Sequence, residues 1–168
     1  MIRLRSLIEE DNAEDNSVEF TIRRAKQDDL LTLVKLEEYT SASPWSEKAL
    51  GSDLLNETGA VVLVAEAANT ENKSVIGYCD AWLVAGEAQL NNIAVFQQYR
   101  RCGVGEALLR ELMEESRKAG CTTMNLEVRK SNIKAYALYE KLGFVKDGLR
   151  RGYYEDNGED AVLMSVGL

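Results

Sequence analysis

The sequence predicts one α/β domain built around a mixed sheet, and three observations support that prediction. The chain has 168 residues, a length that suits a single domain with its own hydrophobic core. Residues 60–66 and 75–84 are apolar, strand-like segments joined by a polar turn, as in an antiparallel hairpin. Residues 88–128 then follow the order strand, helix, strand, which places two parallel strands in one sheet through a right-handed crossover.

The first third of the domain is expected to contribute one strand and two helices. Val18–Ala25 has strand character, and Asp28 or Asp29 can cap a helix that runs to about Tyr39. Apolar residues recur along this helix at the spacing of one helical face: Leu30, Leu33, Val34 and Leu36. A second, short helix is expected after Ser46, whose hydroxyl suits an N-cap.

The rest of the chain continues the pattern of strands and helices. The expected strands are 60–66, 75–84, 88–95, 122–128, 144–154 and 161–166, and the expected helices are 103–118 and 132–142. Gly120 and Gly143 suit the ends of these two helices, because a helix commonly closes with a glycine in the left-handed conformation. Polar turns are expected at 69–73 and at 156–158.

Charge and composition narrow the classes of partner and of chemistry. The chain carries 28 acidic and 20 basic side chains, a net charge of −8, which argues against nucleic acid and suits a basic protein or an amine. It contains no histidine, the usual general base and metal ligand. Cys79, Cys102 and Cys121 are too widely spaced to indicate a zinc site or a disulfide framework. We therefore expect chemistry by carboxylates, tyrosines, amines or backbone groups, without a metal.

The sequence also indicates a cytoplasmic protein without a membrane anchor. Its apolar runs are far shorter than the roughly 20 residues of a membrane span. Arg3 and Arg5 are followed by acidic residues instead of the apolar core of a signal peptide. Residues 1–17 are polar and acidic, which predicts a flexible N-terminal extension ahead of a domain over residues 18–168.

The segment from Arg100 to Gly105 predicts an anion-binding site. It follows the strand that ends with Ile93-Ala94-Val95, and it leads into the long helix at 103–118. A helix N-terminus offers unpaired N–H groups and a partial positive charge, so it favours a phosphate. Gly103 and Gly105 allow close approach to the backbone of this loop, which also includes Cys102 and Val104, and Arg100 and Arg101 add donors and charge. Taken alone, the two glycines are also compatible with an ordinary tight turn.

Together with five further segments, this loop resembles the GNAT acetyltransferases, and within them the RimI type of ribosomal-protein-alanine N-acetyltransferases. The matching segments are Pro44-Trp45-Ser46-Glu47, Asn92-Ile93-Ala94-Val95, Leu126-Glu127-Val128-Arg129 with Ser131-Asn132, Ala137-Leu138-Tyr139 with Leu142-Gly143-Phe144, and Tyr153-Tyr154 with Glu159-Asp160-Ala161. The resemblance spans Phe20 to Val166. One departure is Gln97, where many relatives carry a proline that makes the loop entry more rigid.

The resemblance implies a fold and a donor substrate. The fold would be a mixed, mostly antiparallel sheet of six or seven strands, with a central parallel pair splayed around acetyl-CoA and about four helices on both faces. Arg100 to Gly105 would hold the pyrophosphate of acetyl-CoA. The backbone of Ile93, Ala94 and Val95 would line the pantetheine arm, and the Val95 N–H would support the thioester oxygen. Asn132 would hydrogen-bond the cofactor, although as a residue it also suits a helix cap.

The resemblance also implies the two groups that move protons. Glu127 interrupts an apolar strand and would be the general base, although an ion pair with Arg129 or another cation explains it as well. Tyr139 would contact the cofactor and protonate the departing thiolate, although it also suits a core aromatic. An α-amine with a pKa near 7.8 is roughly 10–20% free base at pH 7, whereas a lysine amine is about 0.04% free base, so a carboxylate serves an α-amine far more easily.

The acceptor implied by the RimI type is the N-terminal alanine of small-subunit ribosomal protein eighteen, whose α-amine would attack the acetyl carbonyl directly in a ternary complex. Trp45, Tyr153 and Tyr154 would line the acceptor cleft, and Cys102 is poorly placed for an acyl-enzyme. The alternatives are a broader Ard1-like N-terminal acetyltransferase, a polyamine or small-amine acetyltransferase, and a non-catalytic CoA-binding subunit. We expect no direct contact with nucleic acid or membrane, and a monomer or weak homodimer.

Overall fold

The fold is described from a computed structural model, which describes residues 18–41, 44–56, 59–68 and 74–168. The predicted N-terminal extension at 1–17 and the predicted turn at 69–73 lie outside the described residues. Within these ranges, none of the helices is long and apolar enough to cross a membrane.

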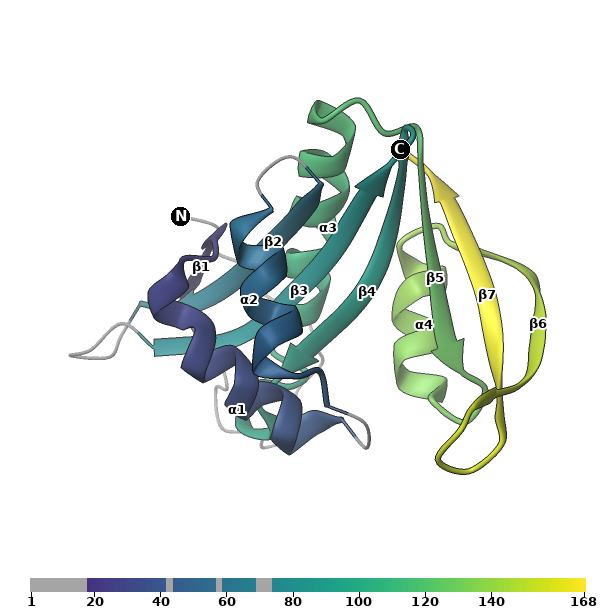
Figure 1. Ribbon diagram of the computed structural model, residues 1–168, viewed down its shortest axis with the longest axis horizontal. Coiled ribbons are helices and arrows are strands. Elements are labelled where there is room, and N and C mark those ends of the chain that lie inside the picture. The colour runs from purple at the N-terminus through teal and green to yellow at the C-terminus, as the bar shows by residue number, and fades with distance from the viewer. Residues whose placement is uncertain (1–17, 42–43, 57–58, 69–73) are drawn as a thin grey trace, which may run out of the picture.

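A seven-stranded mixed sheet forms the centre of the molecule (Figure 1), and its strand order is β1-β2-β3-β4-β5-β7-β6. The strands are β1 Phe20–Arg24, β2 Ala60–Ala67, β3 Ser74–Val84, β4 Glu87–Val95, β5 Thr123–Arg129, β6 Val145–Tyr154 and β7 Glu159–Gly167. Every neighbouring pair is antiparallel except β4 and β5, which are parallel. The predicted hairpin and the predicted parallel crossover are both confirmed.

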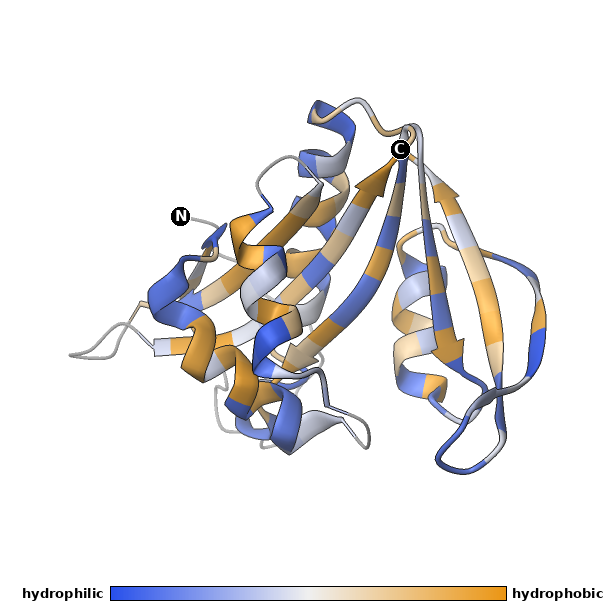
Figure 2. Cartoon of the chain, viewed as in Figure 1, coloured by the Kyte–Doolittle hydropathy of each residue, from blue (hydrophilic) through white to orange (hydrophobic). Residues whose placement is uncertain are grey.

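Helices cover both faces of this sheet. They are α1 Leu30–Thr40, α2 Glu47–Leu55, α3 Val104–Lys118 and α4 Ile133–Lys141, with 3-10 turns η1 Gln27–Asp29 and η2 Gln97–Tyr99. One core packs α1 and α2 against β2, β3 and β4, and it includes Leu33, Leu36 and Tyr78. The larger core lies on the other face, where Leu108 of α3 and Tyr139 of α4 belong to one cluster. Figure 2 shows apolar and polar residues alternating along several strands, as expected for a sheet with faces of different character.

Local capping explains several helix boundaries. Ser46 Oγ accepts a hydrogen bond from Ala49 N at 3.2 Å, which confirms the predicted N-cap of α2. Gly120 closes α3 with φ of +91°, as its position predicted. The predicted aspartate cap of α1 is wrong: Asp29 occupies the N-cap position without a side-chain cap bond. Its carboxylate instead accepts from Lys26 N at 2.7 Å and pairs with Arg23, which fixes η1 to β1.

The parallel strands β4 and β5 separate partway along their length. Their pairing runs from Glu87 with Thr123 to Leu90 with Leu126. Immediately beyond, the pairing of β4 with β3 shifts register, because Asn91 is an extra residue that forms a bulge. The remainder of β4 follows β3, and Figure 1 shows β4 and β5 diverging below this point. The sheet is therefore open between the last residues of β4 and the end of β5.

Candidate active site

The main chain of β4 faces the opening between the two parallel strands. Phe96 N donates to Ile76 O of β3 at 3.1 Å. Because backbone groups alternate in direction along a strand, Ile93 and Val95 turn their N–H and C=O groups away from β3, toward the opening. The Ala94 side chain is buried with the α1 and α2 core. Part of this outward edge is bonded within the chain, because Ile93 N donates to Asn92 Oδ1 at 2.9 Å and Val95 O accepts from Arg100 Nε at 3.0 Å. The Ile93 C=O and the Val95 N–H also face the opening.

The loop after β4 leads into α3 with backbone N–H groups available. Arg101 and Gly103 both have positive φ, +64° and +81°. The Ala107 N–H donates to Gly103 O at 3.0 Å, so the preceding N–H groups of the first helical turn have no intrahelical acceptor. The Val104 side chain is buried in the larger core, and the Cys102 thiol donates to Arg100 O at 3.5 Å. Main-chain donors are therefore available at the N-terminus of α3, where the sequence predicts an anion site.

Gly105 lies where this helix meets the opening in the sheet. A Cβ at Gly105 would lie 3.6 Å from Leu138 Cδ2 and 3.8 Å from Ile93 Cδ1, ordinary contact distances. Packing within the protein therefore tolerates a small side chain here, and the glycine keeps the space between β4 and α4 clear. Arg100 donates from Nε to Val95 O at 3.0 Å, which ties the loop to the end of β4, while Arg101 is exposed. These residues fit a long pyrophosphate ligand that runs from the helix into the opening.

Glu127 lies on β5 just past the last residue that pairs with β4. The side chains of β5 alternate between buried and partly exposed, so Glu127 lies on the face opposite Leu126 and Val128. Gln89 Nε2 donates to Glu127 Oε2 at 2.9 Å, and Arg150 Nη1 contacts Oε1 at 3.3 Å. From the sequence, an ion pair with Arg129 or another cation was the alternative explanation for Glu127. The structure identifies Arg150 as the cation that pairs with it.

Arg129, next but one to Glu127 along the strand, serves a different purpose. Its guanidinium contacts both carboxylate oxygens of Asp156, at 2.9 and 3.0 Å, and stacks 3.8 Å above the Tyr154 ring. It also pairs with Glu159 at 3.4 Å. Hydrogen bonding by the Ser131 side chain is the main cause that lowers the pKa of Glu159 to about 2, and the Ser131 N–H, which donates to Glu159 at 2.6 Å, is the second. These bonds join the β6–β7 turn to the end of β5.

Tyr139 is buried on α4 at the other side of the opening. Its side chain is 5% exposed and packs on Phe144 with ring centroids 5.7 Å apart, so its ring is part of the core. Burial raises the pKa of Tyr139, with smaller contributions from Tyr154 and Cys79. The hydroxyl therefore stays protonated at neutral pH and can act as a proton donor. Asn132 caps α4 by accepting from Ala135 N at 3.2 Å, the alternative role that its residue type indicated.

Tyr154 interacts electrostatically with both groups that the resemblance singled out. Burial raises the pKa of Tyr154, Arg129 opposes that shift, and the carboxylate of Glu127 adds to it. Because Tyr154 also acts on Tyr139, it is a common neighbour of Glu127 and Tyr139. Tyr153 packs edge-on against Tyr154 with centroids 5.1 Å apart and is 41% exposed. The tyrosine pair therefore forms part of the wall on the β6 side of the site.

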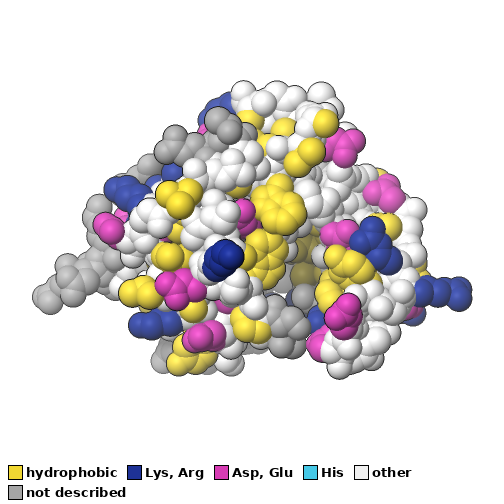
Figure 3. Space-filling model, viewed as in Figure 1, with side chains coloured by type: hydrophobic (Ala, Val, Ile, Leu, Met, Phe, Trp, Pro, Cys, Tyr) yellow, Lys and Arg dark blue, Asp and Glu magenta, His cyan; other side chains and the backbone are white. Residues whose placement is uncertain are grey.

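An aromatic pair lies on the α2 side. Trp45 packs on Trp82 with ring centroids 5.8 Å apart, and Trp82 Nε1 donates to Asp53 Oδ1 at 3.1 Å. Figure 3 shows hydrophobic side chains bordering a hollow between the two halves of this face. Trp82 was missed from the sequence, because a tryptophan on a strand reads equally well as a core residue.

Two buried acids near the bulge were also missed. Glu37 of α1 is fully buried and accepts from Tyr78 Oη at 2.6 Å, Asn92 Nδ2 at 2.6 Å and Trp45 N at 3.0 Å. It thereby joins the Trp45 segment to β3 and β4. The available signal was an acid four residues after Leu33 on the apolar face of the predicted helix. Asp80 of β3 is fully buried as well, and burial together with Asp53 raises the pKa of Asp80 to about 8.

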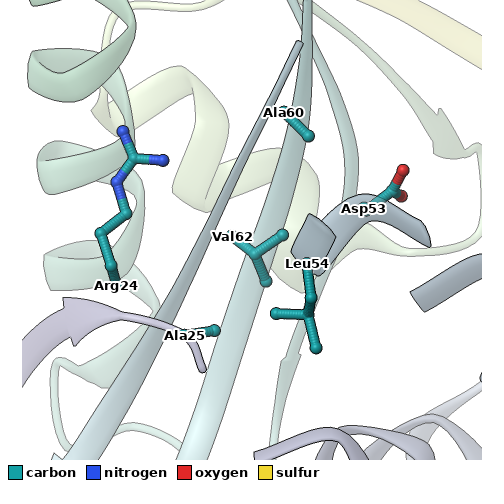
Figure 4. Close-up of a pocket in the computed structure, with 6 residues that line it drawn as sticks. All are labelled: Arg24, Ala25, Asp53, Leu54, Ala60 and Val62. Carbon is teal, nitrogen blue, oxygen red and sulfur yellow. The ribbon is translucent and has the colours of Figure 1, made fainter. Parts of the chain in front are cut away.

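A cavity of about 300 Å³ lies elsewhere on the molecule (Figure 4). It is lined by Arg24, Ala25, Asp53, Leu54, Ala60 and Val62, from β1, β2 and α2. In Figure 4 Arg24 extends toward α3, where it pairs with Glu115 at 3.0 Å. The lining of this cavity includes none of the predicted site residues. Among the residues that the structure describes, no group of three or more Cys, Asp or Glu side chains is arranged to hold a metal ion.

Comparison with known proteins agrees with this geometry. Residues 22–144 match the family described as the acetyltransferase (GNAT) family. The [ribosomal protein bS18]-alanine N-acetyltransferase of Escherichia coli strain K12 is 40% identical over 148 residues, covering 87% of this chain and 96% of that protein. An N-alpha-acetyltransferase of Saccharolobus solfataricus is 34% identical over 164 residues, covering 90% of this chain and 95% of that protein.

A solved structure shows the same likeness in three dimensions. The crystal structure of the ribosomal-protein-S18-alanine N-acetyltransferase from Escherichia coli superposes with a TM-score of 0.78 at 38% sequence identity. The match covers 89% of this chain and 94% of that one. The predicted fold, including its splayed parallel pair, is therefore confirmed.

Proposed function

The chain belongs to the acetyltransferase (GNAT) family, and we propose that it transfers the acetyl group of acetyl-CoA to the α-amine of an N-terminal alanine. The proposed acceptor is ribosomal protein bS18, because the Escherichia coli relative named for that reaction is 40% identical. A net charge of −8 suits a basic acceptor protein. The observation that carries the proposal is the half-buried carboxylate of Glu127 at the point where β4 and β5 separate.

The proposed donor site combines three parts of the chain. Acetyl-CoA supplies the acetyl group as an activated thioester. The N–H groups of the first turn of α3, with Arg101 beside them, would hold its pyrophosphate. The outward backbone of Ile93 and Val95 would bond the pantetheine arm. The Val95 N–H would donate to the carbonyl oxygen as negative charge develops there, an interaction worth a few kcal/mol when the donor is fixed beforehand.

Two side chains would move the protons. Glu127 would accept the proton of the acceptor ammonium, directly or through water, and so free the amine for attack. Tyr139 would donate to the departing thiolate, a role that suits a buried phenol whose raised pKa keeps it protonated. Each such contribution is typically worth 10²–10⁴ in rate. The wall formed by Tyr153 and Tyr154 and the opposite pair of Trp45 and Trp82 would border the acceptor N-terminus.

Thioester consumption with a panel of acceptors tests the proposal. We expect turnover with peptides that begin with alanine, and much slower turnover with spermidine or with a lysine peptide blocked at its N-terminus. Glu127→Gln and Tyr139→Phe are expected to lower kcat by at least about a hundredfold, whereas Arg151→Met, a neighbouring surface change, is expected to leave it unaltered. Losses of only a few fold in both site variants would refute the assigned roles.

A broader N-terminal acetyltransferase is the second candidate, and the relative from Saccharolobus solfataricus, at 34% identity, favours it. The same panel separates the two. Comparable kcat/KM for peptides that begin with alanine, serine or methionine would support the broad enzyme. A preference of tenfold or more for alanine would support the dedicated one.

A further inference from the structure

Both carboxylate oxygens of Glu127 are occupied before any acceptor arrives. Gln89 Nε2 holds Oε2 at 2.9 Å, and Arg150 Nη1 pairs with Oε1 at 3.3 Å. An acceptor ammonium that gives its proton directly to Glu127 must come close to one of these oxygens. Each oxygen can accept a second donor, but the positive guanidinium of Arg150 repels an arriving ammonium, whereas the neutral amide of Gln89 does not. Arg150 is therefore the partner that competes with the ammonium.

Gln89 is a fixed partner. It lies on β4 within the paired part of the parallel ladder, opposite Asn125, and its side chain is half-buried. Glu127 follows Asn125 by two residues, so the two side chains lie on the same face of adjoining strands. The hydrogen bond therefore joins two rigid neighbours immediately before β4 and β5 separate.

Arg150 is a loosely held partner. Its side chain is 52% exposed, and it reaches Glu127 from the edge strand β6, across β7. Among the described residues its one ion pair is with Glu127, and it also stacks 4.9 Å above the Tyr153 ring. The pairing of β6 with β7 is interrupted directly after Arg150, where Gly152 has a φ of +58°. Arg129, with two acidic partners and a stacked ring, shows how a fixed arginine is held in this same region.

We propose that Arg150 is an exchangeable counter-ion of Glu127, which the α-ammonium group of the acceptor replaces at Oε1 while Gln89 keeps Oε2 in place. This inference rests on the proposed function. In the free protein the guanidinium of Arg150 balances the negative charge of the Glu127 carboxylate, whose side chain is 24% exposed. When the acceptor binds, one cation leaves and another arrives, so the charge around Glu127 is unchanged. Arg150 then remains over Tyr153 or turns to solvent, and Glu127 takes a proton from the ammonium, which leaves the neutral amine free to attack.

Steady-state kinetics with an alanine peptide at saturating acetyl-CoA provide the first test. Arg150→Met removes the competing cation, so KM for the peptide should fall about two- to fivefold, the range expected of a partly exposed ion pair, while kcat does not fall. Arg150→Lys keeps the charge and should behave like the wild type. Arg151→Met is the matched control, because it removes the same charge from the next residue of β6 and should leave KM unchanged. Raised KM in Arg150→Met, or an equal fall in Arg151→Met, would overturn the exchange.

Equilibrium binding separates this inference from the proposed function, because it needs no turnover. Calorimetry with CoA present compares a peptide carrying a free α-amine with the same peptide acetylated at its N-terminus. Arg150→Met should tighten binding of the free amine two- to fivefold and leave the acetylated peptide unaffected. In a Glu127→Gln background Arg150→Met should lose its effect. An equal gain for both peptides, or a gain that persists in Glu127→Gln, would overturn the proposal even if the enzyme acetylates alanine as proposed.

Discussion

The buried carboxyl of Asp80, next to the partly exposed carboxyl of Asp53, makes stability depend on pH in a direction opposite to that of most carboxylates. Asp80 is fully buried, and Asp53, Glu37 and Asn91 face it. Burial, followed by repulsion from Asp53, raises the pKa of Asp80 from 3.8 to about 8. Asp53 Oδ2 and Asp80 Oδ1 have no hydrogen-bond partner elsewhere in the described part of the chain, so a proton on Asp80 can bridge the two carboxylates. The folded protein therefore keeps a proton on Asp80 that the unfolded chain releases.

Proton linkage determines the sign and the size of this effect of pH on the free energy of unfolding. A folded-state pKa above the unfolded value stabilises the protein at low pH, and this contribution is lost as the pH rises through about 8. Nearly the whole interval from pH 5 to pH 8 lies between the two pKa values. Each pH unit within this interval removes about 1.4 kcal/mol of stabilisation, so the contribution of Asp80 to the free energy of unfolding should fall by about 4 kcal/mol from pH 5 to pH 8.

Asp80→Asn tests this prediction, because asparagine resembles the protonated acid and cannot ionise. Urea denaturation at pH 5, 6, 7 and 8 gives the free energy of unfolding of each protein. The difference between Asp80→Asn and wild type should grow in favour of the variant by about 4 kcal/mol from pH 5 to pH 8. Asp147→Asn, an exposed change of the same charge on β6, should show no such trend. A difference for Asp80→Asn that stays constant within about 0.5 kcal/mol would refute the shared proton.

Three further predictions concern the donor site and the helices. Gly105→Val should raise KM for acetyl-CoA tenfold or more, since the added methyls enter the space beside Ile93 and Leu138, and it should not lower the unfolding midpoint. An unchanged KM in a normally folded variant would contradict the proposed path of the ligand. Glu37→Gln should cost about 2–4 kcal/mol in urea denaturation, because one amide oxygen cannot serve three buried donors; a loss below 1 kcal/mol on the same scale would contradict this. Ser46→Ala should cost about 1 kcal/mol through loss of the α2 cap, and an unchanged denaturation midpoint would count against it.

The elements that the sequence predicted well are those with strong local signals. The hairpin at 60–84 has apolar, strand-like segments on either side of a polar turn, and the helix at 103–118 has apolar periodicity and a closing glycine. The predicted cap at Asp29 was wrong because an aspartate near a helix start can accept from more than one neighbour. Here Arg23 and Lys26 N hold its carboxylate, a contact that depends on β1 lying alongside.

The candidate site was only partly predictable because its polar contacts connect distant parts of the chain. Glu127 stands out locally as a carboxylate among apolar residues, so it was identified. Its partners Gln89 and Arg150 lie 38 and 23 residues away and meet it only through the strand order of the sheet. Asp80 was missed for the same reason: nothing in its neighbourhood along the sequence shows that Asp53 of α2 faces it.

We expect Glu127, beside the opening between β4 and β5, to take the proton of an N-terminal α-amine. Mass spectrometry of an alanine-initiated peptide that also contains a lysine, incubated with acetyl-CoA and the protein, shows which amine is acetylated. Wild type should add one acetyl group, which fragmentation places on the α-amine, and Glu127→Gln should add almost none in the same time. Acetylation of the lysine side chain, or full α-amine acetylation by Glu127→Gln, would contradict the account.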